Sequence, residues 1–379
     1  MQSGKLKKMK VALVYDRVNK WGGAERVLLA LHEMFPDAPL YTSVYDEAKA
    51  PWAKVFPKVY TSFMQKIPFA KSNHEFLAPL MPIAFETLDF NGYDLVISVT
   101  SEAAKGIITK PDTKHICYCL TPTRYLWSHY DLYFKNKFLR FISRPFVEYL
   151  RVWDKVASQR PDQIIAISTE VKNRIRKYYG LDSEIVFPPV EIKNLKLIKN
   201  CKLEIKNYFL VVSRLVPYKR VDLAIKAFNK LKLPLIIVGS GSQEYRLRSK
   251  SKSNIKFVGF VSGEELAKYY RGAKALIMPQ EEDFGIAAVE AQSFGVPVIA
   301  YKKGGVKDTV INGKTGIIFD SQTPEGLIGA IQKFDKWCPD KEELITGAKR
   351  FSKERFQKSF IRACSGGGWR HSPLASFKK

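Results

Sequence analysis

The chain has 379 residues, of which 46% are hydrophobic, and its formal net charge is +25. A chain of this length exceeds what one hydrophobic core usually holds, so we expect two domains, and the ordinary apolar content excludes wholesale disorder. The longest apolar runs, such as Leu235–Val238, suit strands and fall far below the roughly 18 residues that a membrane-spanning helix needs. A basic surface attracts nucleic acid, anionic lipid or phosphorylated small molecules, and charge alone does not choose among them.

The N-terminal region and the cysteines indicate a cytoplasmic protein. Residues 1–10 are basic, and the apolar run that follows, Val11–Tyr15, is too short for the core of a signal peptide. Of the five cysteines, Cys117 and Cys119 are close in sequence, but no second Cys or His pair at ligand spacing accompanies them. We therefore expect reduced thiols and no metal site.

Apolar runs that suit strands alternate with helical segments almost throughout the chain. Runs that are apolar at every position are typical of strands buried on both faces, as in parallel sheets covered by helices. The alternation indicates the α/β class and doubly wound, Rossmann-like domains. The expected strands are residues 11–15, 95–99, 116–119, 164–167, 209–212, 235–238, 275–278, 298–300 and 316–319, and expected helices include 221–231 and 285–294.

The best domain boundary lies near residue 190. Pro188 and Pro189 precede a lysine-rich stretch that continues to Asn207, after which a new strand begins. We therefore expect a first domain at residues 1–190 and a second at 191–360, with ligand bound between them at the carboxyl ends of the strands. Residues 361–379 are expected to be an irregular tail, because the glycine-rich run from Ser365 has no periodicity.

Two glycines follow the first expected strand. Gly22 and Gly23 open a helix that is expected to begin at about Ala24. Backbone N–H groups at glycines can approach a phosphate closely, and a helix N-terminus favours negative charge. A plain tight turn explains the two glycines equally well.

Two cations follow the first strand of the second domain. Arg214 and Lys219 lie on a strand-end loop, which is the crevice position of a doubly wound fold. They can grip a diphosphate there, the arginine through its planar fork and the lysine as a point charge. The alternative interpretation is that both are solvated surface cations.

The most specific pattern contains two glutamates seven residues apart. Glu282 lies in a loop after an expected strand, and Glu290 lies one or two turns into the helix that follows. The carboxylate of Glu290 can accept two hydroxyls of a ribose. The N–H groups of Phe284, Gly285 and Ile286, at the start of the helix, can bind sugar hydroxyls or a phosphate.

These motifs together resemble the retaining GT-B glycosyltransferases of family four, the glycosyl transferases group 1. The resemblance covers about residues 9 to 360, and the first half is similar to a subgroup described as mannosyltransferases of surface-polysaccharide assembly. It implies two Rossmann-like domains facing a central cleft, the first binding an acceptor and the second a nucleotide sugar. The segments that carry it are 22–26, 93–98, 104–106, 117–127, Arg214 to Lys219, 238–241, Glu282 to Glu290, 291–298, 304–308 and 313–316.

The resemblance also implies a role for each motif residue. Arg214 and Lys219 match the diphosphate grip, Glu282 matches a carboxylate near the transferred sugar, and Glu290 matches the ribose ligand. The remaining donor-binding positions are the glycine loop under the phosphates and the edge that holds the base. They correspond to Gly22, Gly23, Phe260 and Val261.

One position departs from the family pattern. The family carries a histidine before Thr-Pro in the first domain, and Leu120 occupies that position here. The neighbouring residues His115 and His129 flank the motif without filling it, and His115 is expected to be structural. The chain is therefore either an enzyme that works without this histidine or one with impaired activity.

The resemblance implies retaining transfer of a hexose, with mannose favoured, from a GDP- or UDP-linked donor to a glycan or lipid-linked acceptor. Cations and helix N-termini would stabilise the leaving diphosphate, so no metal and no further cofactor are expected. Two alternatives stay open: an epimerase or phosphorylase relative of the same fold, and a basic nucleic-acid-binding protein without catalysis. The second alternative leaves the spaced glutamates unexplained.

Residues 131–180 are basic and aromatic. They contain eleven Lys or Arg against five Asp or Glu, with aromatic side chains between the cations. Such a stretch can lie on an anionic membrane, which would make the protein peripheral at the inner face of the membrane. An amphipathic helix packed on its own domain explains the pattern equally well.

Overall fold

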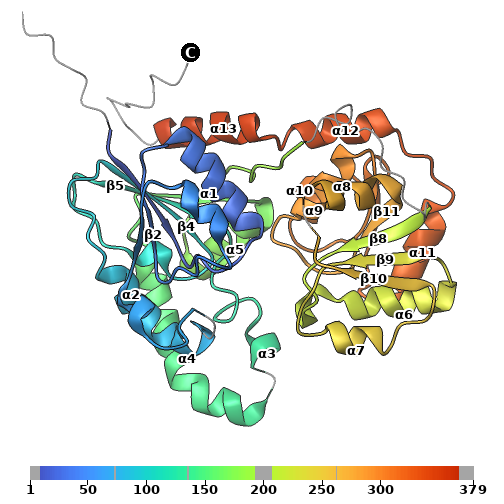
Figure 1. Cartoon of the computed structure of the whole chain (residues 1–379), viewed down its shortest axis with the longest axis horizontal. Helices are drawn as coiled ribbons and strands as arrows, with labels where there is room; N and C mark the ends of the chain where they lie inside the picture. Colours follow the sequence, from blue (N-terminus) through green and yellow to red (C-terminus); the bar gives the residue numbers. More distant parts are fainter. Residues whose placement is uncertain (1–8, 72–73, 135, 193–206, 262, 367–379) are drawn as a thin grey trace, which may run out of the picture. The chain divides into compact units, whose positions relative to one another are not determined.

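The computed structural model describes residues 9–71, 74–134, 136–192, 207–261 and 263–366. Two compact units make up this part of the chain, each with a parallel sheet covered by helices (Figure 1). The first unit holds the described residues up to Pro189 and those from Phe356 onward, and the second holds Val190–Arg355. The lysine-rich stretch after residue 192 and most of the expected tail lie outside the described residues.

The first unit contains a seven-stranded parallel sheet within the described residues, in the order β3-β2-β1-β4-β5-β6-β7. Its strands are β1 (Val11–Tyr15), β2 (Leu40–Thr42), β3 (Val59–Thr61), β4 (Leu95–Thr100), β5 (Lys114–Cys119), β6 (Gln163–Ala166) and β7 (Glu184–Ile185). Its helices are α1 (Gly23–Met34), α2 (Met81–Glu86), α3 (Tyr130–Tyr133), α4 (Lys137–Ala157), α5 (Thr169–Tyr179) and the late α13 (Lys353–Gly366).

The second unit contains a six-stranded parallel sheet in its described part, in the order β10-β9-β8-β11-β12-β13. The strands are β8 (Tyr208–Val212), β9 (Leu235–Val238), β10 (Ile255–Gly259), β11 (Ala273–Met278), β12 (Val298–Tyr301) and β13 (Gly316–Phe319). The helices are α6 (Val221–Leu231), α7 (Glu244–Arg248), α8 (Gly263–Gly272), α9 (Ile286–Ser293), α10 (Val306–Thr309), α11 (Pro324–Phe334) and α12 (Lys341–Lys349).

Both sheets confirm the expected α/β class and doubly wound topology. In each sheet the strand order reverses beside the first strand of the unit, at β1 in one and β8 in the other. Crevices in doubly wound sheets form at this reversal, outside the carboxyl ends of the strands. The loops after β1, β4, β8 and β11 are therefore the positions at which a ligand site is expected.

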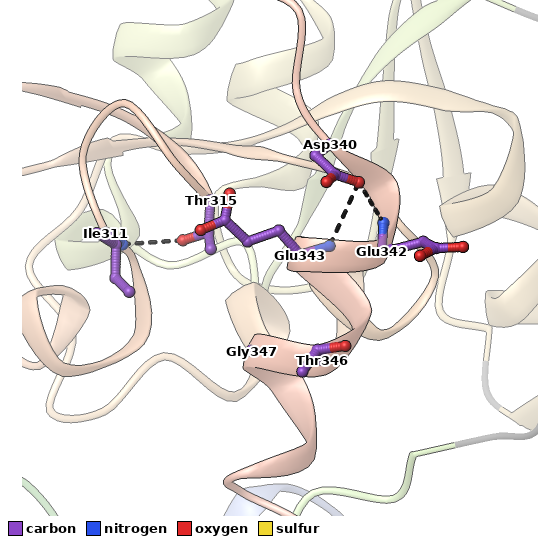
Figure 2. Close-up of a pocket in the computed structure, with 7 residues that line it drawn as sticks. All are labelled: Ile311, Thr315, Asp340, Glu342, Glu343, Thr346 and Gly347. Carbon is purple, nitrogen blue, oxygen red and sulfur yellow. Dashed lines mark hydrogen bonds between the residues drawn. The ribbon is translucent and has the colours of Figure 1, made fainter.

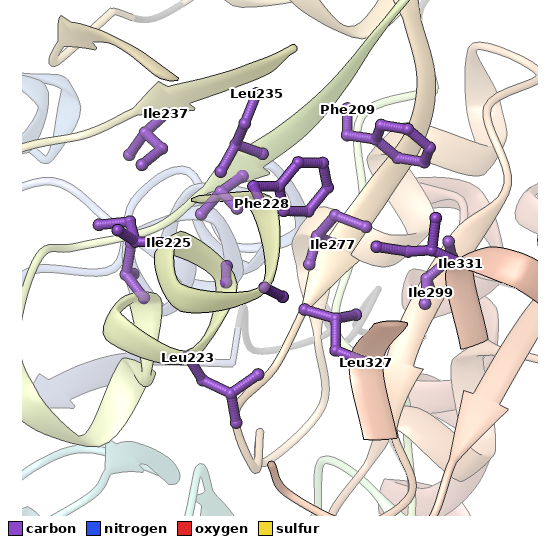
Figure 3. Close-up of a cluster of buried hydrophobic side chains, with 14 of the residues drawn as sticks. Phe209, Leu223, Ile225, Phe228, Leu235, Ile237, Ile277, Ile299, Leu327 and Ile331 are labelled. Atoms are coloured by element: carbon purple, nitrogen blue, oxygen red, sulfur yellow. The ribbon is translucent and has the colours of Figure 1, made fainter. Parts of the chain in front are cut away.

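The core of the second unit holds the strands that carry the site. Phe209 of β8 packs against Phe228 of α6, with ring centroids 5.2 Å apart, and against Phe334 of α11, at 6.0 Å. Figure 3 shows Phe209 and Phe228 among aliphatic side chains of the same buried cluster, including Ile277 of β11 and Leu327 of α11. Because protein cores are close-packed, this cluster fixes where β8 ends and its loop begins.

The end of the described chain differs from the expected irregular tail. α13 is helical through Gly366, and the residues from Phe356 onward belong to the first unit. The rings of Phe356 and Phe360 lie 5.8 and 6.2 Å from that of Tyr118 on β5. A domain assignment that ends the second unit at residue 360 is wrong for this segment, because its aromatic face is buried against the first sheet.

His115 has the structural role that its sequence context suggests. It lies on β5, is fully buried, and its Nε2 is 2.8 Å from the hydroxyl of Ser98 on the neighbouring strand. Burial lowers the pKa of His115 to about 3, and the positive charge of Arg160 adds to the shift. The imidazole is therefore uncharged in the folded protein at neutral pH.

This burial predicts an acid-dependent loss of stability. The unfolded chain regains a histidine pKa near 6.5, so between about pH 6.5 and 3 it binds a proton that the folded chain excludes. Above pH 6.5 the buried neutral His115 does not lower the free energy of unfolding. Below pH 6.5 it lowers this free energy by up to about 1.4 kcal/mol per pH unit. Urea unfolding across this range should give His115→Gln a shallower pH dependence than the parent. Equal slopes for the parent and His115→Gln would contradict this account.

Candidate active site

Three predicted site residues of the second unit lie at the strand-order reversal. Arg214 and Lys219 lie on the loop between β8 and α6, and Glu282 lies on the loop between β11 and α9. β8 and β11 are hydrogen-bonded neighbours. Two loops that are far apart in sequence are thus adjacent at the carboxyl edge of one sheet.

Lys219 and Glu282 form the central contact between these loops. The ammonium group of Lys219 pairs with Oε1 of Glu282, and the two side chains are only 13% and 15% exposed. The amide of the buried residue Gln280 donates to the same oxygen at 2.7 Å. The cation is therefore held in place by a carboxylate that is itself oriented.

Arg214 is more accessible than Lys219. It is exposed, and its guanidinium donates to the hydroxyl of Tyr218 on the same loop. The backbone of this loop extends the ladder between β8 and β9, since the N–H of Leu215 donates to the carbonyl of Ser240 at 2.9 Å. A side chain at Gly239 would meet the carbonyl oxygen of Ser213 at 1.9 Å, so glycine is required there for the loops to pack this closely.

The loop that carries Glu282 is supported by a second pair of glycines. The N–H of Gly305 donates to the carbonyl of Glu282 at 2.8 Å, and a Cβ at Gly304 would lie 2.1 Å from the same oxygen. Gly304 also has a φ of +86°, a conformation that favours glycine. This close backbone approach sets the height of Glu282 above the sheet.

Helix α9 begins immediately after this loop. Gly285, with a φ of +95°, precedes its first residue, Ile286, and the first N–H groups of a helix have no partner within it. Phe284 supplies backbone only, because its side chain is buried against Phe351. Glu290 lies further along α9, where its Oε2 accepts a hydrogen bond of 2.8 Å from Tyr270 of α8.

The two residues expected to hold the base differ in exposure. Phe260 follows β10 directly and is 66% exposed, whereas Val261 packs partly against the core. β10 is the edge strand of the sheet. The geometry leaves the ring of Phe260 available to a planar ligand and gives Val261 a packing role.

The glycine loop of the first unit starts α1 as predicted. Gly22 is the N-cap of the helix, in an extended conformation that any residue can adopt, and Gly23 is the first helical residue. A side chain at Gly22 would meet the carboxylate of Glu25 at 3.1 Å. Glu25 is buried and accepts a hydrogen bond of 2.9 Å from Tyr15 at the end of β1.

Sequence reasoning missed the charged residues beside this loop. Asp16 and Arg17 follow β1, and Arg17 forms an ion pair with Glu102, which follows β4, through both carboxylate oxygens. Buried Asp16 accepts from Thr100 and from backbone N–H groups of the same loop, including Ser101 at 2.7 Å. Burial raises the pKa of Asp16, the charge of Glu102 adds to the shift, and these backbone bonds oppose it. The sequence feature that could have identified this site is the pair Asp16 and Arg17 directly after the first expected strand.

Leu120 lies at the same edge of the first sheet. It follows β5 directly, its N–H donates to the carbonyl of Thr100 at 2.8 Å, and its side chain is partly exposed. The strand-end position expected for the family histidine is thus occupied by an apolar side chain beside the loop that carries Glu102.

A pocket of the second unit lies elsewhere. Its volume is about 510 Å³, and Figure 2 shows its wall formed by the loop before β13 and the start of α12. The carboxylate of Asp340 caps α12 there by accepting from the N–H of Glu342 at 2.8 Å. The residues that line it are Ile311, Thr315, Asp340, Glu342, Glu343, Thr346 and Gly347, and none of them is a predicted site residue.

The contact between Gly304 and Glu282 predicts unequal costs for two glycine substitutions. Gly304→Ala and Gly313→Ala both place a side chain at positive φ, but a Cβ at Gly313 meets nothing within 4 Å. Gly304→Ala must in addition displace the backbone of Glu282, so its loss of unfolding free energy should exceed that of Gly313→Ala by about 1–3 kcal/mol. Urea denaturation measures both losses. Equal losses would contradict this prediction, because they would show that the loop carrying Glu282 moves to accommodate the new side chain at no cost.

Comparison with known proteins agrees with this geometry. Residues 196–363 match the family model described as glycosyl transferases group 1. An uncharacterized glycosyltransferase of Methanocaldococcus jannaschii is 27% identical over 218 residues, 54% of this chain and 58% of that protein. The GDP-mannose-dependent alpha-(1-6)-phosphatidylinositol monomannoside mannosyltransferase of Mycobacterium tuberculosis is 29% identical over 40% of this chain and 44% of its own. The chain thus spans about half the length of these curated relatives.

Solved structures resemble the chain over nearly its whole length. Anabaena HepE in complex with UDP and glucose superposes with a TM-score of 0.68 at 21% identity, covering 94% of this chain and 100% of that one. The apo form of the lipopolysaccharide outer core galactosyltransferase WaaB gives a TM-score of 0.66 at 20% identity, covering 94% and 99%. The match to the glycosyl transferases group 1 model thus lies in residues 196–363, and the chain has the GT-B fold of the glycosyltransferases among these solved structures.

Proposed function

We propose that the protein is a retaining glycosyltransferase that moves a hexose, with mannose as the favoured sugar, from a nucleoside diphosphate to a glycan or lipid-linked acceptor. The observation that carries the proposal is the Lys219–Glu282 ion pair at the strand-order reversal. It joins the two most specific motifs of the sequence in one place. A solvated surface cation would not be held by a carboxylate that a buried amide also orients.

The chemistry follows from where charge develops. The bond that breaks joins the anomeric carbon of the sugar to a phosphate oxygen, and negative charge grows on that oxygen as the sugar leaves. Lys219, Arg214 and the N-terminus of α9 are oriented positive groups, and such groups stabilise this charge more in the transition state than in the ground state. An acceptor hydroxyl attacks on the face that the leaving group vacates and gives up its proton to the departing phosphate oxygen, which gives retention.

The remaining predicted residues bind rather than react. Glu290 accepts the ribose hydroxyls of the donor, and the hydrogen bond from Tyr270 to its Oε2 fixes the carboxylate for this role. Phe260 offers an exposed ring to the base, and Gly22 and Gly23 present backbone N–H groups to a phosphate.

The comparisons support a nucleotide-sugar donor and leave its base open. HepE is described in complexes with UDP and with UDP-glucose, and the mycobacterial relative is described as GDP-mannose-dependent. The choice of mannose rests on the resemblance of the first half of the chain to mannosyltransferases. A lipid-linked acceptor would place the enzyme at the cytoplasmic face of a membrane as a peripheral protein. No helix of the described residues is long and apolar enough to cross a bilayer.

Donor hydrolysis without acceptor tests the function. GDP- and UDP-linked hexoses are incubated with the protein, and we expect at least one to be consumed, with GDP-mannose first. Calorimetry should then show that Glu290→Ala weakens binding of the matching nucleoside diphosphate by about 1.5–3 kcal/mol, the usual contribution of hydrogen bonds to a charged group. Binding of RNA that exceeds nucleotide binding at matched salt, with no donor consumed, would favour the nucleic-acid-binding alternative instead.

The diphosphate grip predicts kinetic losses in turnover. Arg214→Ala and Lys219→Ala should each lower the turnover number about 100-fold, because about 3 kcal/mol of leaving-group stabilisation is lost and each 1.4 kcal/mol is about tenfold. Arg214→Lys should also be impaired, since a point charge does not replace the fork. Steady-state kinetics with varied donor measure this, with the exposed Lys226→Ala on α6 as an unaffected control. Variants that keep their turnover number and only need more donor would place these cations in ground-state binding.

A further inference from the structure

One face of α4 is apolar and exposed along the whole helix. Phe138, Phe141 and Phe146 are 68%, 76% and 54% exposed, and Ile142, Val152 and Val156 continue the same face. Phe141 and Ile142 are adjacent and the other successive members are three to six residues apart, which at 3.6 residues per turn places all six on one side of the helix. Of the large exposed hydrophobic side chains in the described part of the chain, α4 holds the densest group.

The opposite face of α4 packs against the rest of the first unit. Val147 and Leu150 are buried in a cluster with Leu126, and Asp154 and Ala157 are buried further along. The apolar face is therefore not the packing face of this helix. The N-terminal turns of α4 extend away from the first sheet, which leaves that side open within the unit (Figure 1).

A row of cations runs beside the apolar face. It consists of Lys137, Arg140, Arg144, Arg151 and Lys155. Arg140 pairs with Asp131 and Arg151 with Glu148, whereas among the described residues no carboxylate pairs with Lys137, Arg144 or Lys155. Cations at this spacing form one stripe on the helix, beside the exposed aromatic side chains.

We propose that α4 docks on an anionic lipid bilayer, with its apolar face among the headgroups and acyl chains and its cationic row toward lipid phosphates. A helix with aromatic and aliphatic residues on one face and Lys and Arg on the other lies in the plane of a membrane interface. The cations make anionic lipid the matching partner. They also oppose a second copy of this chain, because self-association through this face would bring two like-charged rows together.

The helix is also attached to the loops at the carboxyl edge of the first sheet. Asp154 pairs with Lys105, which follows β4, and accepts hydrogen bonds from Thr123 and Trp127, which follow β5. A bilayer bound by α4 is thus held at a fixed position relative to the loop that begins with Leu120. If the bilayer is held there, these loops form the side from which a lipid-linked acceptor enters. This last point alone rests on the proposed function.

Vesicle co-sedimentation of the full chain tests the apolar face. The protein should bind phosphatidylcholine vesicles that contain phosphatidylglycerol. The combined variant Phe138→Ser, Phe141→Ser and Phe146→Ser should bind them at least about tenfold more weakly, because the exposed rings supply the apolar area that enters the lipid. Tyr245→Ser, which alters an 89% exposed ring in the second unit, should bind like the parent. Equal binding by parent and triple variant, or no binding by the parent, would overturn the proposal.

The cationic row is tested with charge reversals. Arg144→Glu with Lys155→Glu should remove the preference for anionic over neutral vesicles, and salt should weaken binding of the parent. The control carries Lys226→Glu with Lys250→Glu, which make the same change of net charge at exposed lysines of the second unit. A control that loses the preference to the same extent would show that net charge alone, and not this row, selects the lipid.

Two further readouts separate the outcomes. Light scattering that shows a dimer of the parent and a monomer of the triple Ser variant would assign the face to a second copy and overturn the lipid proposal. Donor hydrolysis is measured on the same preparations, and the triple Ser variant should hydrolyse donor like the parent. Vesicle binding without any donor use would reject the proposed function alone, and donor use without vesicle binding would reject the docking proposal alone.

Discussion

The first unit depends on one buried carboxylate. Oδ1 of Asp154 accepts from Lys105 and from Thr123, and Oδ2 accepts from Trp127 at 2.7 Å and from Tyr179 at 2.8 Å. A buried charge is tolerated only when it is paired and hydrogen-bonded, and here the four partners come from three different elements. The loops after β4 and β5, helix α5 and helix α4 are thereby tied to one another. The carboxyl edge of the sheet keeps its shape because no one of them can move alone.

The two units use the same device at their strand-order reversals. Arg17 and Glu102 join the loops after β1 and β4, as Lys219 and Glu282 join those after β8 and β11. Each cation is fixed by a carboxylate before any ligand arrives, so little reorganisation is needed when negative charge approaches. In the second unit the backbone approach of Gly304 adds a steric restraint on the same loop. Position at the reversal, rather than residue type alone, distinguishes these cations from the many others on a basic chain.

The sequence predicted the buried strands well because their apolar runs are continuous. β1, β9, β13 and α6 have the expected bounds, and most other central strands differ by one or two residues. β2, β3, β7 and β10 were missed. The first three have three residues or fewer, which give no periodicity to detect, and their identity as strands comes from pairing with neighbours. The motif at residues 282–290 was located correctly at a strand-to-helix loop. Its contacts with Gln280 and Tyr270 could not be foreseen, because hydrogen bonds between separate segments depend on the tertiary fold. The roles of these residues remain predictions.

Helix α13 gives the protein an order of assembly. Phe356 and Phe360 pack against Tyr118 in the core of the first unit, yet the ribosome makes them only after the entire second unit. During synthesis an apolar surface of the first sheet therefore stays uncovered until α13 is made. The second unit has all of its described strands before that point and can fold first. A nascent chain stalled before residue 356 would expose that surface to chaperones. Production of residues up to Pro189 alone would leave the same surface bare. The first unit is therefore built from two separate segments of the chain, and cutting the chain at one position does not yield both units intact.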